Sequence, residues 1–192
     1  MYKKFHVPKD MIVVVEGPDG SGKTPLVNRL AKLGFVKYQC LFVPPFMSGY
    51  DDFIVWDTPE QAYGELMSIS NFRHAGNSLV MDRSIPSWCI YNIIGSGEYS
   101  LDSRMVNWNS ALKRWKGAAV VCLSSTDDNL KKNVAKKSGI DILDSPLVIE
   151  KDKYNIVYNK IDADIRINYF VDDYSKDWIS DVVSKIFAKM RK

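Results

Sequence analysis

Short apolar runs alternate along the chain with segments in which apolar residues recur every three or four positions. The runs, which are rich in β-branched side chains, predict buried strands at 11–15, 35–43, 79–81, 118–123 and 163–171. The helical spacing predicts a helix that follows residue 24 and further helices at 58–73, 86–94, 101–116, 126–138, 147–159 and 175–190. Strands that alternate with helices favour right-handed βαβ units and a mostly parallel sheet. We therefore expect an α/β fold.

Composition indicates one domain that is not built for a membrane. The chain has 192 residues, of which 46% are apolar and 26% are charged, as in a soluble globular protein. No linker or repeat divides residues 1–192, and no apolar run approaches the roughly 20 residues of a membrane helix. The first residues lack the apolar stretch of a signal peptide, and three widely spaced cysteines suit neither a disulfide framework nor a zinc site. We expect a single domain in a reducing cytoplasm, with no membrane partner.

The stretch 11–30 carries the motif around which the chain is organised. Between its predicted strand and helix, the sequence GPDGSGKT fits G-x-x-x-x-G-K-[ST], the pattern of a phosphate-binding P-loop. Glycines let backbone N–H groups converge on phosphate oxygens at a helix N-terminus. Lys23 is expected to be an exposed ligand of the β- and γ-phosphates of ATP, and the Thr24 hydroxyl a ligand of Mg²⁺. The predicted ATP-binding residues are Gly17, Pro18, Asp19, Gly20, Ser21, Gly22, Lys23 and Thr24.

A second motif begins where the strand predicted at 79–81 ends. Asp82 follows this buried strand, and an acid at the carboxyl end of a strand beside the P-loop can hold Mg²⁺ directly or through water. Arg83 comes next and can bind a phosphate with two parallel hydrogen bonds. We therefore predict Lys23, Asp82 and Arg83 as catalytic residues, and Thr24 and Asp82 as the metal ligands.

The two motifs together resemble those of thymidylate kinases. That family carries Glu-Gly-x-Asp-Gly-x-Gly-Lys-[Ser/Thr], which matches 16–24. It also carries Asp-Arg-Tyr-x-x-Ser-x-x-Ala-Tyr-Gln, whose Asp, Arg, Ser and Tyr recur at the same spacing in 82–92. The resemblance implies a three-layer P-loop kinase fold, with about five strands in a mostly parallel sheet flanked by helices. It also implies that Asp19 faces the acceptor sugar, that Arg83 touches the acceptor or transferred phosphate, and that Ser87 and Tyr91 line the acceptor pocket.

The chain departs from the second motif of this family at three positions. Ser84, Ile90 and Asn92 replace the family's Tyr, Ala and Gln where the resemblance puts the acceptor base or sugar. The helix that corresponds to the family's acceptor helix carries Phe72 and Arg73, and it lies closer in sequence to the motif than in bacterial thymidylate kinases. Phe72 would stack on the base and Arg73 would bind the phosphate. The alternative is a core phenylalanine and a solvated arginine.

Lysines gather where the resemblance places the LID of these kinases. We assign a LID-like segment to about 131–146, with Lys132, Lys136 and Lys137 as its candidate cations. The family usually has an arginine here, and a lysine lacks its planar fork. Clamping of the transition state is therefore expected to be weaker or to come from elsewhere. A solvated basic helix face is the alternative interpretation.

The motifs predict an ATP- and Mg²⁺-dependent phosphotransferase, and three readings of its function stay open. By resemblance, the acceptor is a deoxynucleoside monophosphate, either thymidylate or a modified pyrimidine nucleotide. In the second reading the chain belongs to a bacteriophage branch that phosphorylates the hydroxymethyl group of 5-hydroxymethyluracil in DNA, and it works in the host cytoplasm. In the third it is a non-catalytic ATP-binding switch or scaffold. The sequence is compatible with a homodimer and with a monomer.

Overall fold

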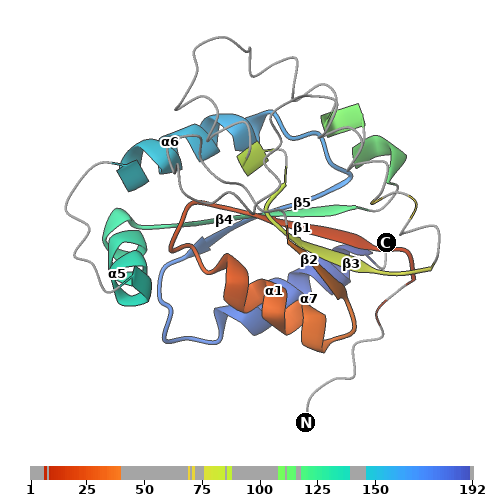
Figure 1. The fold of residues 1–192 in the computed structure, drawn as a ribbon, viewed down its shortest axis with the longest axis horizontal. Helices are drawn as coiled ribbons and strands as arrows, with labels where there is room; N and C mark the ends of the chain where they lie inside the picture. The colour runs from red at the N-terminus through yellow and green to blue at the C-terminus, as the bar shows by residue number, and fades with distance from the viewer. Residues whose placement is uncertain are drawn as a thin grey trace, which may run out of the picture.

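In the computed structural model, parallel strands form one sheet with helices on both of its faces (Figure 1). The structure describes residues 7, 9–39, 69, 71, 76–84, 86–87, 108–110, 112–115, 118–138 and 146–190. The strands are β1 (Ile12–Glu16), β2 (Val36–Gln39), β3 (Leu79–Asp82), β4 (Ala119–Ser125) and β5 (Ile165–Val171). The helices are α1 (Lys23–Lys32), α5 (Asp127–Ser138), α6 (Pro146–Asn159) and α7 (Trp178–Met190).

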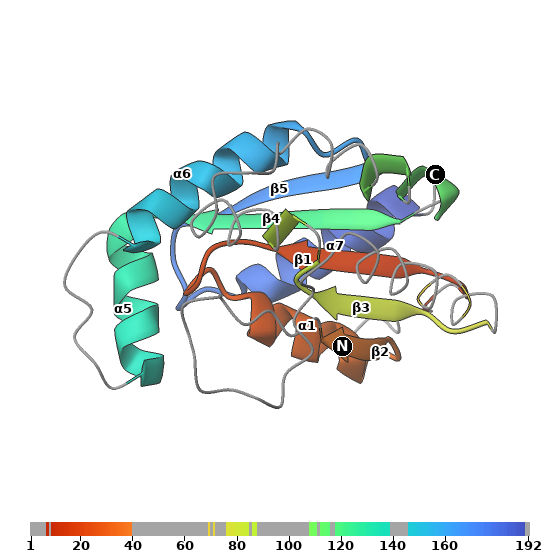
Figure 2. The ribbon, with the colours of Figure 1, turned by 45° about the horizontal axis from the view of Figure 1, so that its top comes forward.

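The strand order is β2-β3-β1-β4-β5, and every neighbouring pair is parallel (Figure 2). β1 lies at the centre, where Val15 is in register with Asp82 of β3 on one side and Val121 of β4 on the other. The chain builds β2 and β3 on one side of β1 and then crosses to β4 on the other. Open α/β sheets bind ligands at the carboxyl ends of the strands beside such a reversal. The fold therefore predicts a ligand-binding site at the carboxyl ends of β1 and β3.

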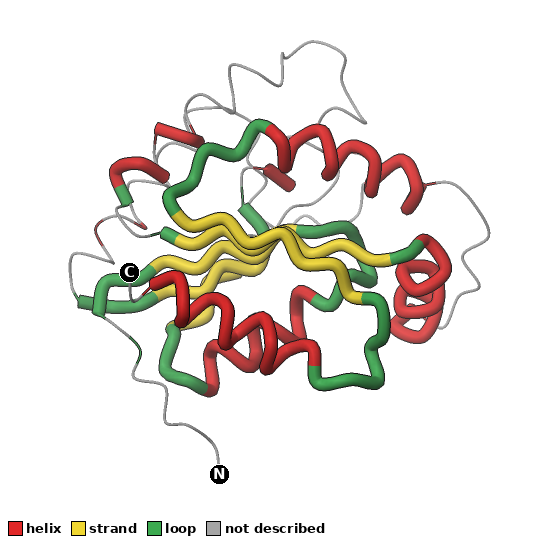
Figure 3. Tube along the Cα trace, turned by 180° about the vertical axis from the view of Figure 1, so that it is seen from behind, coloured by secondary structure: helices red, strands yellow, loops and turns green. Residues whose placement is uncertain are grey.

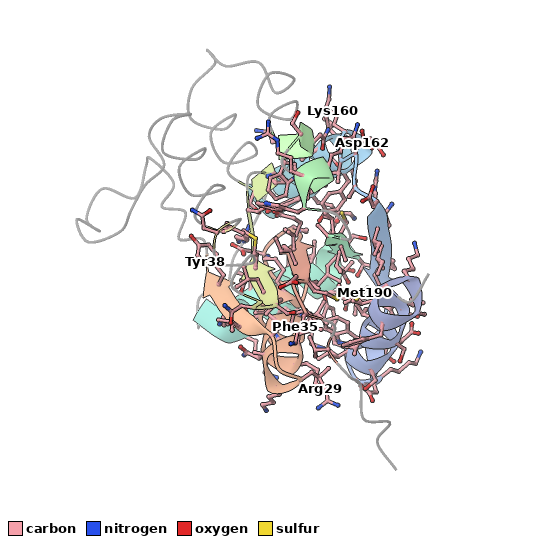
Figure 4. All side chains as sticks on the ribbon, turned by 90° about the vertical axis from the view of Figure 1, so that its right-hand side faces the viewer. Arg29, Phe35, Tyr38, Lys160, Asp162 and Met190 are labelled. Carbon is pink, nitrogen blue, oxygen red and sulfur yellow. The ribbon has the colours of Figure 1, made fainter. Side chains whose placement is uncertain are left out.

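β1 is buried along its whole length because helices cover both faces of the sheet (Figure 3). Side chains alternate between the faces of a strand. Val13 and Val15 pack with α1 and α7, whereas Ile12 and Val14 pack with α6 and with the tryptophans at 108 and 115. In the layer that α1 and α7 form on one face of the sheet, Phe35, labelled in Figure 4, contacts Phe187 of α7 edge to face, with ring centroids 6.3 Å apart. The uninterrupted apolar pattern of β1 follows from this double coverage.

The predicted elements recur in the described parts of the chain, with shifted ends. The strand predicted at 35–43 is β2, with 40–43 outside the described residues, and the last helix begins at Trp178 rather than at 175. The helices predicted at 58–73, 86–94 and 101–116 are described only in part, where 69, 71, 86–87, 108–110 and 112–114 are helical. No helix in the described ranges has the length and apolar character needed to cross a bilayer.

Candidate functional site

The P-loop motif forms a turn between β1 and α1, and two of its glycines permit the backbone conformation of this turn. Gly20 and Gly22 have φ angles of 80° and 91°, in the left-handed region. A Cβ at Gly20 would lie 2.5 Å from the backbone oxygen of Leu130 in α5, and one at Gly22 would lie 2.7 Å from the ring of Trp178. Each position therefore needs glycine both for its backbone conformation and for the close approach of another element.

Lys23 is the first residue of α1, and its ammonium group lies inside the loop. Its Nζ donates hydrogen bonds to the carbonyls of Gly17 at 2.7 Å and Pro18 at 2.8 Å, and lies 3.6 Å from the Asp19 carboxylate. The residue is only 6% exposed, so the expectation of an exposed lysine is wrong. The reason is that its aliphatic stem is buried along the loop while carbonyl oxygens satisfy its charged head. A phosphate at this site would compete with those two carbonyls for the ammonium.

Thr24 and Asp82 lie together, as the sequence predicts for a pair of metal ligands. The Thr24 hydroxyl, in the first turn of α1, donates to Asp82 Oδ2 at 3.3 Å, and the register of β1 and β3 sets Asp82 beside Val15, just before the P-loop. Among the described residues, no group of three or more acidic, histidine or cysteine side chains could form a larger metal site. One hydroxyl and one carboxylate nevertheless suit Mg²⁺, which prefers oxygen ligands and takes the rest from water and substrate phosphates. The donor set therefore fits this ion.

Arg83 turns back toward the P-loop directly after β3. Its φ of 73° is in the left-handed region, and its N–H donates to the Val15 carbonyl at 3.0 Å. A left-handed arginine is strained and persists only where its surroundings fix it. Its guanidinium contacts the Asp19 carboxylate, the Tyr154 hydroxyl at 2.6 Å and the Ser87 hydroxyl at 3.4 Å. The structure thus brings Asp19, Arg83 and Ser87 together beside the P-loop.

Glu16 is the buried acid beneath this group. Its carboxylate accepts hydrogen bonds from Ser84 at 2.7 Å and from Ser87 at 2.5 Å, and all three side chains are fully buried. Burial raises the pKa of Glu16 to about 7, although the two serines, Arg83 and Lys23 oppose the shift. Ser84, which replaces the family's tyrosine, therefore faces this acid and not the solvent. The sequence marks Glu16 only as an acid at the end of an apolar strand and as the first residue of the motif at 16–24, and neither signal predicts its burial against two serines.

Two elements far apart in sequence hold the carbonyl of Gly20. Asn133 of α5 donates to it at 2.9 Å, and the Tyr174 hydroxyl, in the loop between β5 and α7, donates at 3.0 Å. The Tyr174 ring also meets Trp178 edge to face. Sequence reasoning missed Asn133, Tyr174 and Tyr154, because no motif marks them and only the fold brings them to the P-loop.

The remaining predicted site residues lie mainly beyond what the structure describes. Phe72, Arg73 and Tyr91 are outside the described residues, as is the whole connection between α5 and α6, residues 139–145. Lys132 and Lys136 are exposed on α5, and only the backbone of Lys137 is described, within the same helix. Their part in a LID stays a prediction, although α5 itself contacts the P-loop.

Comparison with known proteins identifies the fold. No protein-family model matches the sequence, and a search of curated protein sequences finds no significant match. Among solved structures, the YorR protein of Bacillus subtilis in complex with phosphorylated GDP is similar, with a TM-score of 0.64 and 16% identity over 94% of this chain and 98% of that one. Deoxyadenosine kinase from M. mycoides with bound dCTP gives a TM-score of 0.55 at 13% identity, covering 93% of this chain and 100% of that one.

A gluconokinase from Sinorhizobium meliloti 1021 gives a TM-score of 0.52 at 14% identity, over 96% of this chain and 94% of that one. The TM-scores show a shared architecture, and at identities this low the likeness concerns the fold alone. The chain has the α/β three-layer fold of P-loop kinases, as the sequence predicts.

Proposed function

We propose that this chain is an ATP-dependent kinase that transfers the γ-phosphoryl group to the phosphate of a deoxynucleoside monophosphate. One observation carries the proposal. Two cations, Lys23 from the P-loop and Arg83 from the end of β3, flank the same carboxylate oxygen of Asp19. In this proposal Lys23 binds the phosphates of the donor and Arg83 binds a phosphate of the acceptor. By resemblance to thymidylate kinases, thymidylate or a modified pyrimidine nucleotide is the preferred acceptor.

In this proposal the donor and the metal are bound by the residues already described. The loop 17–24 holds ATP, and Lys23 leaves the two loop carbonyls for the β- and γ-phosphate oxygens. Thr24 and Asp82 hold Mg²⁺, which supplies positive charge at the donor phosphates when it is bound. Asp19 turns to a sugar hydroxyl of the acceptor, and Arg83 binds the acceptor phosphate. An oxygen of that phosphate attacks the γ-phosphorus, the bond to the β–γ bridging oxygen breaks, and ADP leaves.

The acids near the site favour a phosphate acceptor over a hydroxyl acceptor. A phosphate monoester is mostly ionised at neutral pH, since its second pKa is about 6, so it can attack without losing a proton to a base. A hydroxyl acceptor has to lose a proton. Among the described residues on this side of the loop, Asp19 is paired with Lys23 and Arg83, and Glu16 is sealed behind Ser84 and Ser87. Neither carboxylate is therefore presented as a base in this arrangement, and the sugar hydroxyl that Asp19 bonds in the proposal is not the reacting group.

The solved neighbours support a nucleotide in this site. YorR was solved with phosphorylated GDP, and the deoxyadenosine kinase with dCTP and, in another structure, with the products dCMP and dCDP. These are ligands of those proteins. They support the proposal because the strand ends and the loop that would hold such ligands are common to the fold.

A transfer assay with labelled ATP tests the proposal directly. The acceptor panel contains deoxynucleoside monophosphates, deoxynucleosides, unmodified DNA and DNA containing 5-hydroxymethyluracil. We expect label in a deoxynucleoside diphosphate. Label in the modified DNA or in nucleosides, with none in any mononucleotide, would assign a different acceptor. A protein that binds ATP but labels no acceptor would instead be the non-catalytic switch or scaffold.

Lys23→Ala should lower the transfer rate by about 10²-fold or more, because the cation that offsets charge on the transferred group is removed. Lys185→Ala is the matched control, since Lys185 also lies on a helix and pairs with an acid, Asp181, but on the exposed face of α7. Both variants should keep the circular dichroism spectrum of the parent protein. A Lys23→Ala variant with normal turnover would contradict the catalytic role of the loop.

A further inference from the structure

We propose that Tyr154 of α6 is a positioning residue, which holds the Arg83 guanidinium on the acceptor side of the P-loop through a directed chain of hydrogen bonds that ends on Glu16. Its kinetic consequences rest on the proposed function, whereas the chain of contacts rests on geometry alone. Tyr154 is separated from Arg83 by 71 positions and reaches it from a different layer of the fold.

The direction of the chain follows from counting protons. A guanidinium has no acceptor, so Arg83 Nη1 donates to the Tyr154 oxygen at 2.6 Å. The Ser87 hydroxyl has one proton and donates it to Glu16 Oε2 at 2.5 Å. The Tyr154 and Ser87 oxygens are 2.7 Å apart, and the remaining proton is that of the tyrosine, so Tyr154 donates to Ser87. All three bonds therefore point from the cation to the carboxylate.

The inner part of this series of hydrogen bonds, from Tyr154 through Ser87 to Glu16, is held in place because it is buried. Tyr154 is 1% exposed, and Ser87 and Glu16 are completely buried. The Tyr154 ring packs against that of Tyr158, with centroids 5.5 Å apart, and Ser84 occupies the second oxygen of Glu16. Breaking one of these hydrogen bonds would leave a buried polar group without that partner, and the free-energy cost would be larger than that of losing a hydrogen bond exposed to water. The tyrosine hydroxyl is thus a fixed point for the arginine.

Such a fixed point matters because the acidic partner of Arg83, Asp19, also pairs with Lys23. Nη2 of Arg83 contacts Asp19, whose carboxylate is 56% exposed and also lies 3.6 Å from Lys23. If Asp19 turns to an acceptor sugar, Nη2 becomes available for the acceptor phosphate while Nη1 stays bonded to Tyr154. One edge of the guanidinium is then held by the protein, and the other binds substrate. Holding a group in its reactive orientation is a direct contribution to rate.

The experiment compares two tyrosines of the same helix at pH 8. Tyr154→Phe keeps the ring and removes the hydroxyl, and we expect the KM for the acceptor to rise roughly tenfold, the factor for one hydrogen bond to a charged group. The kcat should fall as well, and the KM for ATP should stay within about twofold. Tyr158→Phe is the control, because it removes a buried hydroxyl that bonds the Leu123 carbonyl at 3.0 Å and not Arg83. Equal effects of both variants on the acceptor KM would overturn the proposal.

A double-mutant cycle with Arg83→Lys tests whether Tyr154 acts through the arginine. If it does, adding Tyr154→Phe to Arg83→Lys should change the acceptor KM by no more than about twofold. Effects that multiply would mean that Tyr154 acts separately and would overturn the proposal. Ser87→Ala, which removes the middle link, should reproduce the kinetics of Tyr154→Phe. Normal acceptor kinetics in Ser87→Ala would also count against it.

A measurement without turnover separates this inference from the proposed function. NMR of arginine side chains reports rotation of the Arg83 guanidinium, which should be slow in the unmodified protein and in Tyr158→Phe, and fast in Tyr154→Phe. If the protein transfers phosphate to no nucleotide, the proposed function fails while this outcome still supports the hydrogen-bond chain. Rotation that is equally fast in all three proteins would overturn the chain even in an active enzyme.

Discussion

Glu16 makes the stability of the fold depend on pH. Burial raises its pKa from 4.5 to about 7, so the folded protein keeps a proton that the unfolded chain releases between those values. The free energy of unfolding should therefore fall as pH rises through that window and level off above it. The glutamine of the Glu16→Gln variant cannot titrate. We therefore expect the free energy of unfolding of the parent protein to fall by about 3 kcal/mol more than that of Glu16→Gln over this pH range. Urea unfolding of both proteins at pH values near 4 and 8 measures it, and a difference that does not change with pH would contradict the assignment.

Single residues were predictable where chemistry is local in the sequence. The spacing of the P-loop predicts that Lys23 and Thr24 lie in the loop and at the start of the helix, and an acid after a buried strand predicts that Asp82 lies nearby; their contacts agree with this placement, while their roles stay predictions. The burial of Lys23 was predicted wrongly, because a motif specifies residue types and not the depth at which their side chains lie. Tyr154 could not be predicted, since its contact with Arg83 exists only once α6 has packed on the sheet.

The contact of α5 with the P-loop can be tested with two glycines that have nearly equal φ angles. Gly20 and Gly76 have φ angles of 80° and 82°, but a Cβ at Gly20 would lie 2.5 Å from the Leu130 oxygen, whereas the nearest atom at Gly76 is 3.9 Å away. Gly76→Ala should cost about 1 kcal/mol for the left-handed backbone alone. Gly20→Ala should cost roughly 1–3 kcal/mol more, because α5 or the loop must shift, and it should weaken ATP binding. Urea unfolding and ATP titration measure both effects. Equal decreases in the free energy of unfolding of the two variants would mean that α5 does not pack closely against the loop at Gly20.

Elements were predictable in kind, but not in their neighbours. Apolar runs and helical spacing identify β1, β3, β4, α5 and α6 to within a few residues, because both patterns record which side chains face the core. The position of β3 beside the P-loop strand was expected from Asp82 and is confirmed, whereas local patterns do not predict that β4 pairs with the other side of β1, because that pairing depends on how the whole chain crosses the sheet. The contacts of Asn133 and Tyr174 with Gly20 depend on the same crossing.

Over the whole molecule, the layer beneath the sheet and the site at the strand ends should contribute separately to stability and function. Phe187 of α7 is 2% exposed and packs in the layer with α1, whereas Phe170 of β5 is 53% exposed. Phe187→Ala should lower the free energy of unfolding by about 3–5 kcal/mol, because it leaves a cavity in a packed layer. Phe170→Ala, the same change on the surface, should cost about 1 kcal/mol or less.

In conditions where both variants stay folded, the KM for ATP should match that of the parent protein, because the P-loop is held by backbone conformation and by α5, α7 and the β5–α7 loop at other residues. Urea unfolding followed by kinetics at low temperature measures both quantities. A large rise in the KM for ATP in folded Phe187→Ala would show that this layer also shapes the loop, and that stability and binding are coupled through α7.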